Sequence, residues 1–582
     1  MSGICGYAGN ANPSVLDAML AAIDYRGDAT DTAHGAGFGL GYCWWRGRPG
    51  KSPSIHRNGG QSVACAGTLA PPSSSPASAL LARLSRAGDA LEDLDGAFAA
   101  AWWDADRRRL TLIRDPFGVR SLYYVEHAGV FYFASELKQL LAIPDLPVAV
   151  DAAALHKYLT FSFVPGEDVP VRGVRRLLPG KVATRQDGYL EIRPYFTLVE
   201  NIDPRFDDRQ SAVKFIRGHC RRAMERRLNG EKEAGIFLSG GLDSSGVAVW
   251  LKQAGVDVRA FSLDFGERSV EKPQAQAVAD RLEIPLTFVK VGGEDIATIL
   301  MDLVWKLDLP FGDAVTGPQY LLGKAARTAG LSAIFNGEGG DQLFGGWTSK
   351  PMISAQLYAG LYGDDSREEI YLRSYHRFYG LEEQLYTPEF RGQVGGPGQR
   401  RALLKPYLES GNAATFLNRV RLADIALKGS QNILPRMERM SNAWALDVRV
   451  PLFDRALASA SFRLPPSMKL HGACEKYVLK LMLQKQLPKE IVWRRKFGMS
   501  VPITDWVLGP LAAQMEDLVG SASLAKRALF RNEFVERLRQ GQNQPNETRR
   551  RRIGERLWAL AMLEAWLRIF IDRRGRRPGG GA

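Results

Sequence analysis

The chain has 582 residues, far more than the roughly 100–200 residues of one typical domain, so its length predicts at least two domains. Hydrophobic residues make up 45% of the chain and charged residues 24%, a balance that is ordinary for a soluble globular protein and excludes global disorder. The net charge is +14, and segment 491–582 is basic, with 18 Lys and Arg against 9 Asp and Glu. Such a segment could attract nucleic acid, an anionic membrane or an acidic peptide. Solvated arginines on helices are the simpler interpretation.

Cysteine usage and hydropathy indicate the cellular compartment of the protein. The five cysteines are scattered and include no C-x-x-C pair: Cys5, Cys43, Cys65, Cys220 and Cys474. Such a set is neither a disulfide framework nor a zinc site. No signal peptide pattern opens the chain, and the most apolar run, 557–571, contains Glu564 and Arg568 and is shorter than the about 20 apolar residues that span a bilayer. We therefore predict a cytoplasmic protein without a membrane segment.

Short apolar runs punctuated by Gly, Pro and Asp fill the first 200 residues. These runs alternate aromatic and small side chains, which predicts an antiparallel sheet with one buried face. They lie at 37–45, 97–104, 109–115 and 121–135. The composition of 70–78 predicts a loop.

The pattern changes near residues 195–210, where a polar linker precedes a helix over 211–228. Strands and helices then alternate, which predicts a parallel sheet flanked by helices. The strands fall at 234–238, 258–265, 285–291 and 331–337, and the helices at 244–255 and 273–282. Beyond about residue 350 we expect mainly helices. The final residues, 573–582, predict a disordered basic tail.

The strongest motif is Ser239–Ser245, with the sequence Ser-Gly-Gly-Leu-Asp-Ser-Ser, between an apolar strand at Ile236–Leu238 and a helix that begins near Asp243. Glycines let the backbone approach a ligand, while hydroxyls and amides at a helix N-terminus form a cradle for anions. Nucleotides bind at such loops in α/β proteins. The loop lacks the Gly-Lys-[Ser/Thr] ending of a Walker A motif. It resembles the pyrophosphate loop of ATP pyrophosphatases, which release PPi and adenylate their substrate.

A second Gly-rich loop follows the strand at 331–337 and offers two carboxylates, Glu338 and Asp341. Mg²⁺ prefers oxygen ligands, commonly one or two carboxylates plus phosphate oxygens. Asp243 and Asp341 are therefore the expected pair for holding Mg²⁺ against the triphosphate of ATP. A helix N-cap is the alternative role for either aspartate.

With these loops and several further segments, the sequence resembles the asparagine synthetase family over nearly its whole length. The further segments are 25–31, 94–104, 114–124, 133–140, 439–454, 474–480 and 494–506. The resemblance implies a fold that combines α/β and α+β: a glutaminase-type, Ntn-hydrolase-like αββα sandwich over 1–200, then a parallel-sheet ATP-pyrophosphatase domain, adenine nucleotide α-hydrolase-like, over 205–572 with a helical C-terminal part.

The resemblance also implies a chemistry in which a carboxylate attacks the ATP α-phosphate, PPi leaves, and an amine displaces AMP to form an amide. ATP and Mg²⁺ would be the cofactors. It assigns ATP binding to Leu238, Ser239, Gly240, Gly241, Asp243, Ser244, Ser245, Leu263, Asn336 and Gly337. Lys476 matches the family's catalytic lysine, a fixed cation for developing negative charge, and Glu338 would orient or deprotonate the amine. Arg494–Lys496 would add cations near the phosphates.

The glutaminase-type part departs from the family pattern. Ser2 stands where the processed N-terminal cysteine is the nucleophile, with Cys5 three positions further on. Ala66-Gly67-Thr68 replaces the Asn-Gly-Glu that cradles the glutamine amide, and 73–78 lacks the acidic pocket residue. Arg46 is the counterpart of the arginine that binds the substrate carboxylate. We therefore predict that glutaminase activity is absent.

An intact synthetase site beside an inactive amidotransferase predicts an amine that does not come from glutamine. The β-lactam-forming branch of the family carries Tyr at the position of Glu338, which argues against that branch. The favoured reading is a lasso peptide cyclase-like ligase, which adenylates an Asp or Glu side chain of a peptide and lets its N-terminal amine close a macrolactam. Asparagine synthesis from aspartate with ammonia or glutamine is the first alternative, and a basic nucleic-acid-binding ATPase and an inactive scaffold are the others.

The expected partners follow from this reading. They are a small-molecule or peptide substrate, with a precursor-peptide-binding protein and a peptidase as open possibilities. Neither nucleic acid nor a membrane is expected, because no RNA-recognition motif and no spanning segment is present. The sequence leaves a homodimer open.

Overall fold

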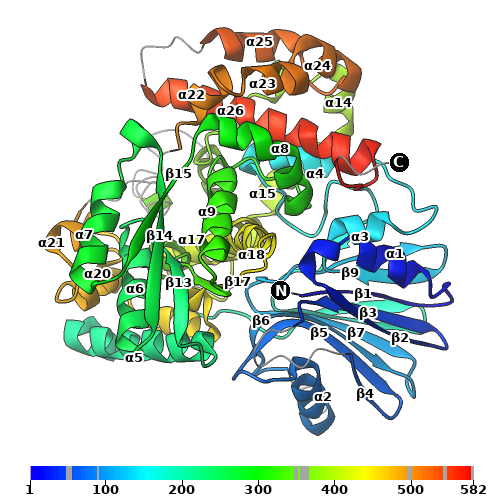
Figure 1. Ribbon diagram of the computed structural model, residues 1–582, viewed down its shortest axis with the longest axis horizontal. Helices are drawn as coiled ribbons and strands as arrows, with labels where there is room; N and C mark the ends of the chain where they lie inside the picture. The colour runs from blue at the N-terminus through cyan, green and yellow to red at the C-terminus, as the bar shows by residue number, and fades with distance from the viewer. Residues whose placement is uncertain are drawn as a thin grey trace.

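The computed structural model describes residues 2–46, 55–87, 91–346, 352–353, 366–396, 398–494, 501–541 and 547–578. Figure 1 shows the N-terminal part at the lower right, in blue and cyan, and the later part of the chain at the left and across the top. The last strand of the N-terminal part ends at Pro194, and the first long helix of the later part begins at Arg209. The passage from one part to the other therefore lies between Pro194 and Arg209.

The N-terminal part is a sandwich of two antiparallel sheets, in the orders β10-β8-β9-β1-β3-β2 and β12-β11-β7-β6-β5-β4. Ile4 and Leu40 of the first sheet meet Ala99 and Leu112 of the second in one buried cluster. Helices α1 and α3 pack on the first sheet and α2 packs on the second, which confirms the predicted αββα fold. The elements are β1 (Ser2–Ala8), α1 (Val15–Ala21), β2 (Ala29–Gly35), β3 (Phe38–Trp44), β4 (His56–Asn58), β5 (Gln61–Ala70), α2 (Pro76–Ala87), β6 (Asp95–Asp104), β7 (Arg109–Arg114), β8 (Tyr123–His127), β9 (Val130–Ala134), α3 (Leu137–Leu141), α4 (Ala152–Phe161), β10 (Arg175–Arg176), β11 (Lys181–Gln186) and β12 (Tyr189–Pro194).

The later part contains a parallel sheet in the order β15-β14-β13-β16-β17, which confirms the predicted α/β domain. The edge strand β17 was not expected, because its residues follow a long helical stretch and form only a short strand. The strands and their helices are α5 (Arg209–Leu228), β13 (Glu233–Phe237), α6 (Leu242–Gln253), β14 (Asp257–Asp264), α7 (Lys272–Leu282), β15 (Leu286–Lys290), α8 (Gly293–Leu307), α9 (Thr316–Thr328), β16 (Ala333–Phe335), α10 (Gly340–Phe344) and β17 (Asp447–Arg449).

Helices dominate the described residues beyond 366, as predicted. They are α12 (Arg367–Arg373), α13 (Glu382–Leu385), α14 (Pro388–Gln393), α15 (Gly398–Ala402), α16 (Lys405–Leu408), α17 (Phe416–Ala423), the π-helix η4 (Asp424–Ile433), α18 (Leu434–Asn442), α19 (Arg455–Ser461), α20 (Tyr477–Leu483), α21 (Lys489–Val492), α22 (Ile503–Leu508), α23 (Ala512–Val519), α24 (Ser521–Arg527), α25 (Asn532–Gln540), α26 (Glu547–Trp566) and the π-helix η8 (Leu567–Asp572). Among the described helices, none combines the length and apolar character needed to cross a membrane.

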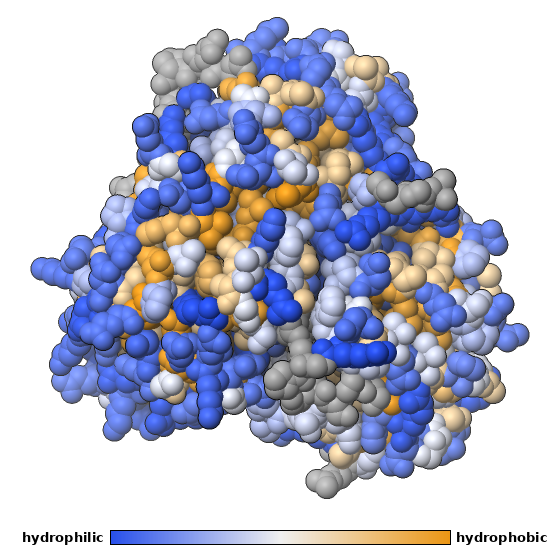
Figure 2. Space-filling model, in the orientation of Figure 1, coloured by the Kyte–Doolittle hydropathy of each residue, from blue (hydrophilic) through white to orange (hydrophobic). Residues whose placement is uncertain are grey.

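Ion pairs accompany many arginines of the basic C-terminal segment. Arg527 contacts Glu564 at 2.8 Å, and Arg568 contacts Asp517 at 2.6 Å. In Figure 2 hydrophilic residues cover the helices at the top of this face, and hydrophobic residues gather between those helices and the parallel-sheet domain below. The ion pairs of Arg527 and Arg568 favour the interpretation of solvated arginines on helices.

The segment 573–578, expected to be disordered, is held against the rest of the molecule. The indole Nε1 of Trp305 donates a hydrogen bond to the Gly575 carbonyl at 2.9 Å, and the Arg574 guanidinium donates to the Leu146 carbonyl at 3.1 Å. Gly575 has a φ of +75°, a conformation that favours glycine and lets the backbone turn here. The last residues, 579–582, lie outside the described residues.

The two parts share a hydrophobic core. One cluster of buried side chains contains Leu141 and Val15 from the N-terminal part together with Leu303, Met437 and Phe570 from the later part. Apolar surface that is buried between two domains stabilises their relative placement, and a shared core of this kind opposes independent motion.

Candidate active site

The loop after β13 folds tightly over the N-terminus of α6. Gly240 has a φ of +66°, and a Cβ atom there would lie 2.5 Å from the backbone nitrogen of Ala275, so only glycine fits. The Gly241 amide donates to Ser239 Oγ at 3.2 Å, and Ser244 Oγ donates to the Gly241 carbonyl at 3.2 Å. Helix α6 begins at Leu242, and its first amides have no partner within the helix. The loop thus places hydroxyls and helix-end amides together, as an anion cradle requires.

The loop after β16 packs directly on this first loop. A Cβ atom on Gly337 would lie 2.4 Å from the backbone nitrogen of Ser244, and one on Gly340 would lie 2.1 Å from Oδ1 of Asp243. Glycine at these two positions therefore allows a close backbone approach that another residue would prevent. The approach brings Asp341, at the start of α10, beside Asp243.

Lys476 joins the two aspartates. It lies just before α20 with a φ of +53° and is 4% exposed. Its Nζ contacts Oδ2 of Asp243 and lies 2.7 Å from Oδ1 of Asp341. Burial alone would lower the pKa of Lys476, but the two carboxylates raise it above its ordinary value. Lys476 is therefore a fixed ammonium at the meeting point of both loops.

Glu338 and Asn336 complete the second loop. The backbone amide of Glu338 donates to Oδ1 of Asn336 at 2.7 Å, and the backbone amide of Asn336 donates to the Arg449 carbonyl of β17 at 3.0 Å. The unexpected strand β17 thus supports a residue that was assigned to ATP binding. Leu238 and Leu263 are buried where the adjacent strands β13 and β14 end, with the Leu238 amide donating to Phe261 at 2.9 Å.

Ser245 and Arg494 also lie at the first loop, with different contacts. Ser245 is fully buried, and its hydroxyl makes no hydrogen bond with the described residues, so it does not share the contacts of Ser239 and Ser244. The Arg494 guanidinium donates to the Gly240 carbonyl at 3.1 Å, which places one cation at the first loop. The rest of its motif, 495–500, lies outside the described residues.

The residues present fit Mg²⁺ that is bound together with a nucleotide. Asp243 and Asp341 supply carboxylate oxygens, and Oδ1 of Asp243 is buried without a hydrogen-bond donor among the described residues. The described parts of the chain contain no group of three or more His, Cys, Asp or Glu side chains placed to hold a metal ion. Mg²⁺ at the two aspartates would therefore take further ligands from phosphate and water.

Two of the glutaminase-type residues, Ser2 on β1 and Gly67 on β5, are in contact. Ser2 Oγ accepts a hydrogen bond from the Gly67 amide at 3.1 Å. Gly67 has a φ of +111°. Its neighbours are the buried Ala66 and the half-buried Thr68, and neither residue type has an amide side chain that could bind glutamine. Arg46 is exposed beyond the end of β3, with its backbone amide donating to Asp28 at 2.7 Å.

The surroundings of Cys5 disfavour a role as nucleophile. Its side chain is fully buried, and burial raises the pKa of the Cys5 thiol well above its ordinary value. A thiolate is the nucleophilic form of cysteine, so a buried neutral thiol is inert.

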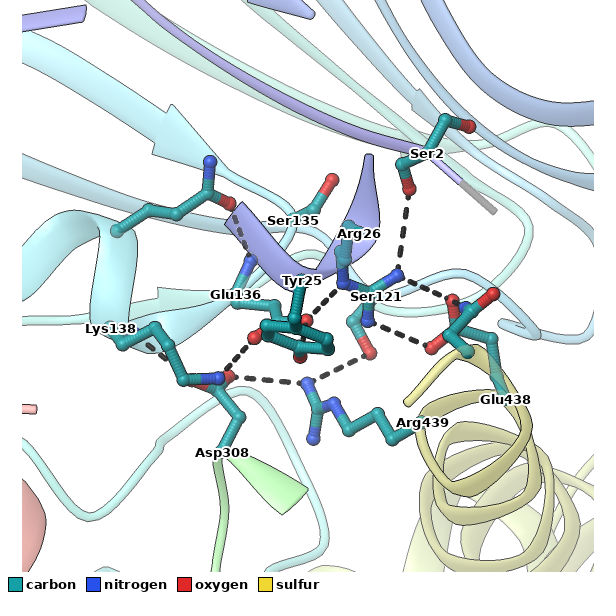
Figure 3. A network of polar contacts seen from close by, with 12 residues as sticks. Ser2, Tyr25, Arg26, Ser121, Ser135, Glu136, Lys138, Asp308, Glu438 and Arg439 are labelled. Carbon is teal, nitrogen blue, oxygen red and sulfur yellow. Dashed lines mark hydrogen bonds and ion pairs between the residues drawn. The ribbon is translucent and has the colours of Figure 1, made fainter. Parts of the chain in front are cut away.

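A network of buried charges between the two parts of the chain was missed by sequence reasoning. Figure 3 shows it around Arg26, Glu136, Lys138, Asp308 and Glu438. The side chains of Glu136, Lys138 and Asp308 are fully buried, with Lys138 Nζ 3.2 Å from Asp308. Burial raises the pKa of Glu136, but Arg26 and Lys138 outweigh burial and hold it below the ordinary value. Segments 25–31 and 133–140, which resemble the family, contain part of this network, and that resemblance was the one sign of it in the sequence.

Comparisons with known proteins agree with this architecture. The family profile described as Asparagine synthase matches residues 216–568, and the profile described as Glutamine amidotransferase domain matches residues 69–196. Asparagine synthetase (glutamine-hydrolyzing) 1 of Bacillus subtilis is 25% identical over 511 residues, covering 84% of this chain and 79% of that protein. Asparagine synthetase (glutamine-hydrolyzing) 3 of the same organism is 27% identical over 437 residues, covering 70% and 67%.

A relative named for a different activity, Amidase chyE of Penicillium rubens, is 25% identical over 499 residues, covering 74% of this chain and 73% of that protein. Relatives of this chain therefore include proteins named for different activities. Because the asparagine synthase profile matches more than half of its length, the chain belongs to the asparagine synthase family, whose members are ATP-dependent carbon–nitrogen ligases.

Proposed function

We propose that this ligase adenylates a carboxylate at the edge formed by residues 239–245 and 336–341 and transfers the acyl group to an amine. The observation that carries the proposal is the convergence of Asp243, Asp341 and Lys476 at the meeting point of two Gly-rich loops. A carboxylate oxygen of the substrate attacks the ATP α-phosphorus, and the bond to the bridging oxygen breaks to release PPi. The amine nitrogen then attacks the acyl carbon, and AMP leaves.

Each residue has a part in these steps that its surroundings support. The loop amides and the hydroxyls of Ser239 and Ser244 bind the leaving pyrophosphate. Lys476 holds a positive charge where negative charge develops on the phosphates. Asp243 and Asp341 would hold Mg²⁺, which supplies charge neutralisation to the triphosphate when bound. Glu338 is half-buried on the second loop and would accept the proton that the attacking amine loses.

We further propose that the amine is not ammonia from glutamine and that the substrate is a peptide or natural product, as in a lasso peptide cyclase-like ligase. The replacement of the nucleophile by Ser2 and of the amide-binding residues by Ala66 and Thr68 supports an inactive glutaminase. Asparagine synthesis from aspartate remains the second candidate, because Glu338 and the neighbouring loop match ordinary synthetases and two relatives bear that name.

Substrate-dependent ATP–PPi exchange separates the candidates. Purified chain is incubated with labelled PPi, Mg²⁺ and ATP, together with either aspartate and ammonium, aspartate and glutamine, or peptides that carry Asp or Glu and a free N-terminal amine. Exchange with a peptide, and loss of one water from its mass, would support the cyclase reading. Robust asparagine formation would refute it. An Asp243→Ala variant should show no exchange, and unchanged exchange would refute adenylation at this site.

A further inference from the structure

Glu438, on helix α18, is held by two arginines of the N-terminal part. Arg26 donates to both oxygens, with Nη1 2.7 Å from Oε1 and Nη2 3.1 Å from Oε2. Arg120 Nη1 donates to Oε1 at 2.5 Å. All three residues are buried, with 2%, 4% and 2% exposure for Arg26, Arg120 and Glu438. Figure 3 shows Arg26 and Glu438 facing each other between the N-terminal strands and α18, with Arg26 also reaching the Ser2 carbonyl.

The residue next to Glu438 contacts the proposed nucleotide site. Met437 is fully buried, and its Sδ lies 3.5 Å from Nδ2 of Asn336. Asn336 in turn accepts the hydrogen bond from the Glu338 amide at 2.7 Å. A continuous series of contacts therefore runs from the Ser2 carbonyl through Arg26, Glu438 and Met437 to the loop that carries Glu338.

The charged end of this series is strongly oriented. Burial raises the pKa of Glu438, but Arg26 and Arg120 outweigh burial and hold it below the ordinary value, so the carboxylate stays ionised. A guanidinium that binds both oxygens of a carboxylate fixes the direction of that carboxylate as well as its position. Bonds at Glu438 therefore oppose rotation of α18 about its own axis, and such a rotation would move Met437 away from Asn336.

We propose that the N-terminal domain is a positioning element for the synthetase site: Arg26 and Arg120 hold Glu438, which keeps Met437 against Asn336 and so fixes the loop carrying Glu338. This inference rests on the proposed adenylation at that loop. It gives a domain without glutaminase activity a direct part in the synthetase reaction. Glu438 is a positioning residue, acting through Met437 and Asn336.

The first test compares two variants that each remove one carboxylate from the domain interface. Glu438→Gln keeps the shape of the side chain, and its arginines retain Glu136 and Asp447, the latter 3.5 Å from Arg120. The matched control is Asp95→Asn, since Asp95 contacts Arg227 of α5 at 3.3 Å across the same interface without reaching α18. We expect Glu438→Gln to weaken MgATP binding about tenfold by titration calorimetry, while Asp95→Asn changes it less than about twofold.

A second variant interrupts the series at its other end and protects the test against misfolding. Met437→Leu conserves volume and removes only the sulfur contact with Asn336, so the fold should be retained. It should weaken MgATP binding in the same direction as Glu438→Gln, and ATP–PPi exchange should fall through a higher KM for ATP.

Each outcome decides the inference. Wild-type MgATP affinity in both Glu438→Gln and Met437→Leu would overturn it, and so would an equal loss in Asp95→Asn, which would indicate a general effect of interface stability. A wild-type chain that binds MgATP but exchanges PPi with no carboxylate would refute the proposed function alone. In that case the binding data would still decide the positioning role.

Discussion

Replacing Lys476 by Met removes the ammonium that lies between Asp243 and Asp341. The lysine side chain is 4% exposed, whereas each carboxylate side chain is 20% exposed. Removing one partner of a buried ion pair destabilises a protein by about 3–5 kcal/mol, and partial hydration of the carboxylates places this case lower, at about 2–3 kcal/mol near neutral pH. Because the fixed cation is also lost from the phosphates, ATP–PPi exchange should fall by about 10²–10³.

The pH dependence of the unfolding free energy identifies the cause of the destabilisation in Lys476→Met. In the wild-type chain the carboxylates raise the pKa of Lys476, so its stabilisation is fully present below the ordinary lysine value of about 10.4 and is lost only as pH rises above it. In Lys476→Met the two carboxylates repel each other, and protonation of one relieves the repulsion. The difference in unfolding free energy between wild type and variant should therefore shrink as pH falls from about 8 to about 5.

Urea unfolding across this pH range measures the effect. Lys480→Met is the matched control, because Lys480 lies one turn further along α20, is 6% exposed and has no ion pair with the described residues. It should lower stability less and without this pH dependence. A loss in Lys476→Met that is equal at both ends of the pH range would refute electrostatic coupling between Lys476 and the two aspartates.

The other predictions concern a glycine, the glutaminase residues and the C-terminus. Gly340→Ala should reduce ATP–PPi exchange at least about hundredfold, because its Cβ would lie 2.1 Å from Asp243, whereas Gly392→Ala, with open space around it, should not; equal rates would contradict the close packing of the loops. Ser2→Cys should release no glutamate from glutamine, since Ala66 and Thr68 remain, and measurable release in a coupled assay would contradict the inactive glutaminase. Truncation after Asp572 removes the hydrogen bonds to Trp305 and Leu146 and should lower the unfolding free energy by about 1–3 kcal/mol in urea, whereas unchanged stability would show that these contacts contribute nothing.

The sequence was most informative where chemistry and local structure use the same residues. Ser239–Ser245 combines glycines, hydroxyls and a helix start within one short segment, so both the turn and its anion-binding character can be read locally. Lys476 has no such local signature, and only the family resemblance pointed to it. Its place between Asp243 and Asp341 depends on a contact across more than two hundred positions of sequence.

Other features lacked a signal because their causes are not local. The strand β17 has only three residues, and it is a strand because it pairs with β16 rather than because of its own composition. The pairing of Arg26 with Glu438 joins residues 412 positions apart. Conversely, the composition of 573–578 resembles a disordered tail, and tertiary contacts with Trp305 override it.

The buried charge network has a consequence for how the chain is made. Ribosomal synthesis delivers the N-terminal domain first, and domains generally begin to fold as they emerge. Arg26 and Arg120 are therefore synthesised well before Glu438, which follows Arg120 by some three hundred residues. Until it arrives, the surface that will become the interface presents unmatched positive charge and open apolar area to the solvent. The N-terminal domain of the nascent chain therefore has an incomplete interface until α18 has been translated.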